Sequence, residues 1–247
     1  MKPEVGRRVF VGSVIAGLPL LFGRSALLAQ GSGLAHKHPT VAGPDPVVDQ
    51  IVRQIALIHN SAQAGPRGAH ARALAAQLRM LSVYLRQQGA DDHVRTAVRE
   101  LVDREGRNTV LYAEPDAEWR QSVMQQYGFR PDERARNVQV NPTHGARETA
   151  LDALLDEGLT PMYERMAATL DKISRPLDRR RRRLVTIAQD DEWQQGFCAE
   201  LWSQYSQAQL MAVPFCLTAR YFAWAAPACL AMEGGAATLL VVYLWEC

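Results

Sequence analysis

Apolar residues recur at helical spacing along most of this chain, and this periodicity limits its fold more than any other feature. The clearest segment runs from Pro46 to about residue 62, because Asp45 can cap a helix there and Pro46 suits its first turn. The alternation of apolar and polar residues that marks a half-buried strand is missing until the very end. The sequence therefore predicts an all-α domain, an irregular bundle of about six to eight helices with an apolar, cysteine-containing C-terminal region. The other predicted helices span 69–88, 91–105, 115–127, 146–157 and 161–174, followed by a helical segment from about 179 to 205.

Two further helix starts have candidate caps. Asp91 or Asp92 is predicted to cap the third helix, because a carboxylate can accept the free N–H groups of a first turn. Thr160 is predicted to cap the helix that begins at Pro161.

The first 35 residues have the three parts of a secretory signal peptide. Arg7 and Arg8 precede an apolar run from Val9 to Phe22, which small residues follow up to Ala35. This run is short for a membrane span, which needs about 20 apolar residues. The sequence predicts a signal peptide at 1–35, a flexible leader at 36–45 and a single helical domain at 46–247. An uncleaved anchoring helix is the alternative.

The segment Gly6-Arg7-Arg8-Val9-Phe10-Val11-Gly12 resembles a twin-arginine export signal, in which an arginine pair precedes Phe and a moderately apolar run. Gly17 and Gly23 dilute the hydrophobicity of that run, and Arg24 adds a basic residue after it. The resemblance implies export of an already folded protein across a bacterial inner membrane, in some cases after a cofactor has been inserted. The expected location is therefore periplasmic or otherwise outside the inner membrane.

The charge of the chain argues against nucleic-acid binding. Removal of the predicted signal leaves about 212 of the 247 residues, enough for one domain with a sizeable core. The whole chain carries a formal charge of +2, but the signal holds four basic residues and one acidic residue, so the remainder carries about −1. Nucleic-acid binding normally requires a clustered positive face, and no such partner is expected.

All four cysteines lie in the last 50 residues, at positions 198, 216, 229 and 247. In an oxidising compartment an even number predicts two disulfides, for which three pairings exist. Two antiparallel segments of 18 residues, or five helical turns, would pair Cys216 with Cys229 at one end and Cys198 with Cys247 at the other. A metal site made from all four cysteines is disfavoured because close CxxC pairs are missing.

The C-terminal region is almost free of charge. Between residues 208 and 232 only Arg220 is charged, and residues 236–245 have no charge. Two prolines and the pair Gly234-Gly235 predict interruptions of any helix, and residues 238–245 have the composition of a strand. Burial in the helical core is the favoured interpretation. C-terminal membrane attachment is the alternative, although an arginine at the centre of a span costs about 2.5 to 3.5 kcal/mol.

Two of the six histidines form a conditional metal site. If cleavage follows Ala35, the mature chain begins His36-Lys37-His38, whose free amine, amides and His38 imidazole can enclose Cu(II) or Ni(II) in square-planar geometry. The histidine spacing matches no familiar zinc, di-iron or c-type haem pattern. His59 and His70 flank the first predicted turn and are expected to be exposed polar residues.

Five consecutive arginines form the strongest charge block. They could bind lipid head groups or another anionic partner at a membrane surface. The alternative is a solvated surface, since nearby acidic residues and salt both screen exposed arginines. The block consists of Arg179, Arg180, Arg181, Arg182 and Arg183.

Two classes of function are compatible with these patterns. The favoured one is a helical binding or interaction module of the cell envelope, acting through a groove between helices or through the arginine block. The other is an exported enzyme or a protein that binds a metal or cofactor, with a site built from residues far apart in sequence. Catalytic and cofactor-binding residues are not identifiable, because no Ser/His/Asp, Cys/His or paired-carboxylate spacing occurs.

Overall fold

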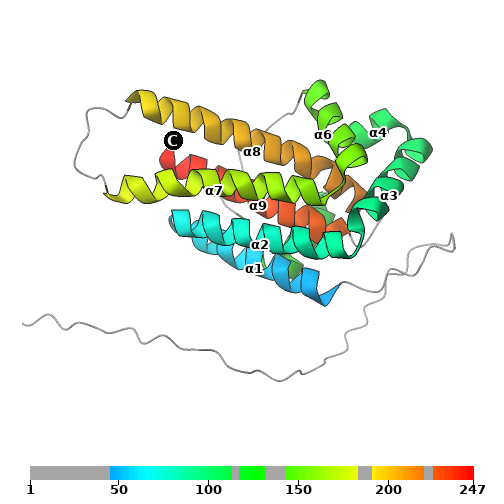
Figure 1. Ribbon diagram of the computed structural model, residues 1–247, viewed down its shortest axis with the longest axis horizontal. Helices are drawn as coiled ribbons and strands as arrows, with labels where there is room; N and C mark the ends of the chain where they lie inside the picture. Colours follow the sequence, from blue (N-terminus) through cyan, green and yellow to red (C-terminus); the bar gives the residue numbers. More distant parts are fainter. Residues whose placement is uncertain (1–44, 113–116, 132–142, 183–190, 220–224) are drawn as a thin grey trace, which may run out of the picture. The chain divides into compact units, whose positions relative to one another are not determined.

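The protein is described by a computed structural model over residues 45–112, 117–131, 143–182, 191–219 and 225–247 (Figure 1). These ranges contain nine α-helices and no strand, which confirms the all-α prediction. All of them belong to one compact unit, Val41–Cys247. The helices are α1 (Pro46–Ala62), α2 (Gly68–Gln87), α3 (Ala90–Glu105), α4 (Arg107–Tyr112), α5 (Ala117–Tyr127), α6 (His144–Glu157), α7 (Thr160–Arg182), α8 (Asp191–Ala219) and α9 (Ala225–Glu246).

The C-terminal helix α9 is the centre of the core. It contacts α1, α2, α5, α7 and α8, and most of its side chains are buried. A helix that is apolar on every side must be buried on every side. Among the described helices only α9 has the length and composition to cross a membrane, and 89% of its most apolar window is buried inside the protein. This burial is what the core interpretation predicts.

The predicted interruptions of the C-terminal helices are wrong. Pro227 lies in the first turn of α9, where the missing N–H would have no helical partner in any case. Helix α8 continues past Pro214, and residues 238–245 are helical instead of extended. Packing on all sides of α9 outweighs the strand propensity of its β-branched residues, because propensities are weak compared with burial.

Helices α8 and α9 pack against each other along their lengths and are joined at both ends by disulfides. Cys198 bonds Cys247, with Cα atoms 5.8 Å apart, and Cys216 bonds Cys229, with Cα atoms 4.8 Å apart. Both distances lie within the usual range for disulfides. This is the nested pairing that the two 18-residue intervals predict.

Helices α2 and α7 form a second antiparallel pair, flanked by ion pairs at heptad spacing. On each helix the charged residues recur every seven residues, or two turns, so that they stay on the same face. Their side chains are about half exposed, and such pairs contribute about 0 to 1 kcal/mol each. The ion pairs favour this register of α2 against α7, while the buried apolar side chains between the two helices supply most of the stability. The pairs are Arg72–Asp178, Arg79–Asp171 and Arg86–Glu164.

The start of α7 is capped by a residue of another helix. The Asp91 carboxylate accepts hydrogen bonds from the backbone N–H groups of Leu159 and Thr160, at 2.7 and 2.8 Å, and from the Thr160 hydroxyl. The predicted role of Asp91 or Asp92 as the cap of α3 is therefore wrong, since α3 begins at Ala90 after Gly89. By contrast, Asp45 caps α1 as predicted.

One helix is absent from the prediction and one is longer than predicted. The sequence does not predict α4, because six residues are too few to show a helical period. Helix α7 continues beyond the predicted end at residue 174 and passes through Pro176 to Arg182. Proline normally ends a helix, but here the packing of α7 along α2 supports the additional turns.

Candidate functional site

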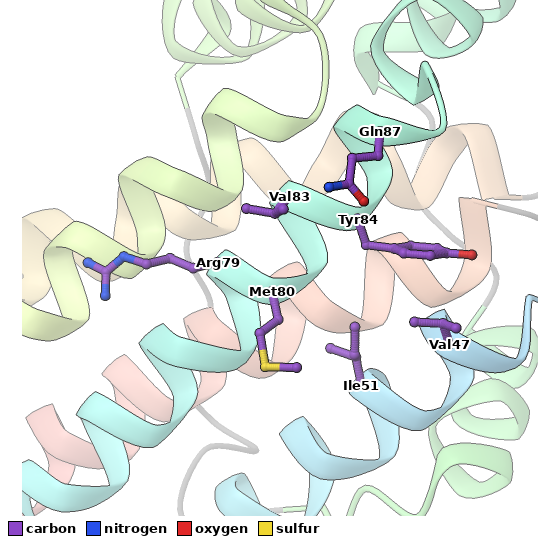
Figure 2. A pocket seen from close by; sticks show the side chains of 7 residues that line it. All are labelled: Val47, Ile51, Arg79, Met80, Val83, Tyr84 and Gln87. Atoms are coloured by element: carbon purple, nitrogen blue, oxygen red, sulfur yellow. The ribbon is translucent and has the colours of Figure 1, made fainter.

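A groove between α1 and α2 is lined by three of the seven large hydrophobic side chains that are exposed among the described residues. Three of its side chains, Val47, Met80 and Val83, are 41%, 55% and 51% exposed. The hollow has a volume of about 390 Å³ and is open to solvent along these side chains (Figure 2). We call it the α1–α2 groove, and it is lined by Val47, Ile51, Arg79, Met80, Val83, Tyr84 and Gln87.

The polar residues of the α1–α2 groove are near its ends. The Tyr84 hydroxyl donates a hydrogen bond of 2.5 Å to the Asp45 carboxylate, just before α1, and this bond raises the pKa of Tyr84. The Arg79 guanidinium is bound to Asp171 of α7. The middle of the groove, between Arg79 and Gln87 on α2, is therefore apolar, and its polar ends are already partly paired (Figure 2).

A second candidate site lies in the core, around a buried carboxylate. Glu233 of α9 is only 8% exposed, and its Oε1 and Oε2 atoms lie 3.0 and 3.1 Å from Nε of Arg120 on α5. Burial raises the pKa of the Glu233 carboxyl, and the Arg120 guanidinium opposes that rise. Burial also raises the pKa of the nearby Tyr205 hydroxyl.

The buried carboxylate is next to the inner disulfide. Oε1 of Glu233 lies 3.5 Å from Sγ of Cys216, and both sulfur atoms and the carboxylate lie within 4.8 Å of one another. Cys216 and Cys229 are each 1% exposed. Cysteine thiolates and glutamate carboxylates are common ligands of divalent metals, so reduction of this disulfide would give the cluster the groups that a metal ion requires. The sequence does not reveal it, because Cys216 and Glu233 are on different helices.

The histidine prediction is partly wrong. His59 is buried, not exposed, with Nδ1 lying 3.3 Å from the Thr238 hydroxyl and Nε2 lying 3.0 Å from Nε2 of Gln63. His70 instead contacts the Ser61 hydroxyl, and burial lowers its pKa. The two histidines therefore have separate partners, and His59 connects α1 to the core helix α9.

The other predicted site residues cannot be assigned contacts. His36 and His38, the predicted Cu(II) or Ni(II) ligands, lie outside the described residues. Arg179 to Arg182 are at the end of α7, where their side chains are not described, and Arg183 lies outside the described residues. The arginine block and the N-terminal metal site therefore remain predictions.

The fold and these sites define an all-α protein whose C-terminal helical hairpin is closed by two disulfides. Comparison of the chain with protein-family models, curated proteins and solved structures finds no match. Its function must therefore be inferred from its own residues.

Proposed function

We propose that this protein is an exported helical binding module of the cell envelope, and that the α1–α2 groove accepts one amphipathic helix of a protein partner. The observation that carries the proposal is the concentration of exposed apolar side chains along this groove. Val47, Met80 and Val83 are exposed to water in the free protein. Their burial against a partner would contribute a binding free energy of about 25 cal/mol per Å² of apolar surface.

The dimensions of the groove support a helix as the occupant. Arg79 and Gln87 are eight residues apart, which corresponds to about 12 Å along α2. About two turns of a partner helix fit this length, with apolar anchors at positions i, i+3 or i+4, and i+7. A peptide that binds by strand addition would need an exposed strand edge, and the described residues contain no strand.

The exported location rests on two observations. Arg7-Arg8 and the apolar run that follows resemble a twin-arginine signal. The structure also contains two disulfides, which persist mainly in oxidising compartments. Both are compatible with a periplasmic binding module.

Site-specific photo-crosslinking in the native cells tests the proposed helix site. A benzophenone amino acid replaces Val83 in the groove, and a matched variant carries it at Leu57, which is 60% exposed on α1 but does not line the groove. We expect position 83, but not position 57, to crosslink one peptide with apolar residues at i, i+3 or i+4, and i+7. A synthetic copy of that peptide should then bind the wild-type protein.

Binding of the synthetic peptide provides the second measurement. Met80→Glu should weaken binding at least tenfold, because it places a charge in the apolar middle of the groove, whereas Leu57→Glu should change binding less than twofold. Equal effects of the two substitutions would contradict the proposed site. Crosslinking of position 83 to lipid would contradict a protein partner.

A further inference from the structure

We propose that the reduced thiols of Cys216 and Cys229, together with Glu233, bind one Zn²⁺ ion, so that this centre holds either a metal ion or a disulfide. The three ligands come from the facing ends of α8 and α9 and from the turn of α9 after Cys229. This inference goes beyond the binding function proposed for the α1–α2 groove and does not depend on it.

The spacing of the ligand atoms fits tetrahedral zinc. With Zn–S near 2.3 Å and Zn–O near 2.1 Å, tetrahedral geometry places sulfur and oxygen ligands about 3.6 Å apart. The observed distance from Cys216 Sγ to Glu233 Oε1 is 3.5 Å. The two sulfur ligands would need to lie about 3.8 Å apart, and reduction permits this by breaking the bond between them.

The charges of the buried cluster balance in the proposed zinc form. Two thiolates and the Glu233 carboxylate carry −3, and Zn²⁺ with the Arg120 guanidinium carries +3. Buried charges are tolerated when they are compensated, and all three ligand residues are less than a tenth exposed. Arg120 would then act in the outer shell, orienting the carboxylate as hydrogen-bonding partners of metal ligands usually do.

The disulfide form does not by itself require a carboxylate at this position. A disulfide has no hydrogen to donate, so the sulfur atoms give Glu233 no hydrogen bond in that form. Arg120 partners the carboxylate, but an uncharged residue on this turn of α9 would avoid burying a charge. A role as a metal ligand in the dithiol form accounts for an acidic residue beside the two sulfurs.

The exchange between the zinc form and the disulfide form balances in protons, bonds and electrons. Zn²⁺ binding to the dithiol displaces two protons, one from each thiol. In the reverse direction the Cys216 thiolate attacks an exchangeable protein disulfide, which forms a mixed disulfide and releases one thiolate of the oxidant. The Cys229 thiolate then attacks the Cys216 sulfur and releases the second thiolate, so the oxidant gains two electrons. The ion loses both sulfur ligands and dissociates.

The proposed export route indicates where in the cell the dithiol form would occur. A twin-arginine substrate folds in the cytoplasm, where thiols are kept reduced. The folded precursor would therefore carry Zn²⁺ at this centre, and oxidation after export would replace the ion by the disulfide.

Titration of the full-length chain with Co²⁺, a spectroscopic substitute for Zn²⁺, tests the site directly. The protein is prepared with its cysteines reduced and its metal removed by a chelator. We expect one Co²⁺ per chain, a thiolate-to-cobalt charge-transfer absorption, and loss of that absorption when Zn²⁺ is added. The oxidised protein should bind Co²⁺ at least 100-fold more weakly. A reduced protein without the charge-transfer absorption would overturn the proposal.

Substitutions locate the ligands. Cys216→Ser/Cys229→Ser should abolish the absorption, whereas the matched control Cys198→Ser/Cys247→Ser, which removes the outer cysteines, should retain it. Glu233→Gln should lower Zn²⁺ affinity at least tenfold, with helicity followed by circular dichroism. If Glu233→Gln loses helicity, Glu233→Asp should show the same loss of affinity. Binding that is indifferent to Glu233, or that persists without Cys216 and Cys229, would contradict the assignment.

Discussion

Gly234 of α9 lies so close to Ile55 of α1 that a Cβ atom on Gly234 would be 2.8 Å from Cγ2 of Ile55. The same atom would be 2.9 Å from Cε1 of Phe129. Both distances are shorter than van der Waals contact, so the absence of a side chain allows the core helix to approach α1. The position therefore tests the packing of α9 directly.

We expect Gly234→Ala to lower the free energy of unfolding by about 1 to 3 kcal/mol, because the added methyl group overpacks the core. Denaturant unfolding measures the change. Gly196 of α8 is the matched control, since a Cβ there meets no described atom within 4 Å. Gly196→Ala should raise the free energy of unfolding by up to about 1 kcal/mol, through helix propensity alone. Equal changes in the two variants would contradict the close packing of α9.

Removal of the interhelix cap should be costly. Asp91→Ala leaves the N–H groups of Leu159 and Thr160 without their acceptor, and we expect the free energy of unfolding to fall by about 1 to 3 kcal/mol. Asp92→Ala is the control, because the Asp92 side chain is largely exposed and pairs only locally, with Arg95. Thermal unfolding of both variants, monitored by circular dichroism, distinguishes them. A loss for Asp92→Ala as large as that for Asp91→Ala would contradict the capping role.

The two disulfides should differ modestly in the stability that they provide. In the chain-entropy model the outer bond, Cys198–Cys247, closes a loop of about 50 residues and stabilises the protein by roughly 4 kcal/mol. The inner bond, Cys216–Cys229, closes a loop of about 14 residues and provides roughly 3 kcal/mol. Unfolding of the two double-serine variants tests the order. Peptide mapping that finds Cys198 bonded to Cys216 or Cys229 would contradict the nested pairing.

Buried Glu233 should make stability fall as the pH rises. Burial raises the pKa of its carboxyl in the folded protein above the ordinary value near 4.5, so the native state retains a proton that the unfolded state releases. The free energy of unfolding therefore decreases from about pH 4.5 up to the raised pKa. Glu233→Gln, which is neutral at every pH, should flatten this part of the profile of the oxidised protein.

Glu200 provides the control for this pH dependence. Its hydrogen bond from Lys172 lowers the pKa of Glu200, so its contribution to stability is lost as the pH falls below the ordinary value. Glu200→Gln should therefore leave the slope above pH 4.5 unchanged. A profile of Glu233→Gln that is as steep as that of the wild type would show that Glu233 is charged in both states.

The export prediction rests on the arginine pair near the N-terminus. Arg7→Lys/Arg8→Lys should leave the precursor in the cytoplasm, because twin-arginine signals require the guanidinium groups and not charge alone. Fractionation of cells followed by immunoblotting measures the distribution, and Lys2→Arg is a control that leaves the pair intact. Continued export of the double-lysine variant would indicate the general secretory route instead.

The sequence alone determined the helical class and most helix boundaries. Val48, Ile51 and Ile55 recur at helical spacing behind the Asp45 cap, and these signals are local, so they can be read without a structure. The 18-residue cysteine intervals likewise predicted the nested pairing, because five helical turns return a side chain to the same face.

Only the tertiary structure decided the features that join distant segments. Asp91 caps α7 instead of its own helix, His59 is buried against Thr238, and Glu233 lies beside Cys216. Each of these contacts depends on how helices pack, and local propensity carries no information about a partner many residues away. For the same physical reason the apolar, glycine-containing C-terminus was ambiguous in sequence, and burial by its neighbours is what makes α9 a continuous helix at the centre of the core.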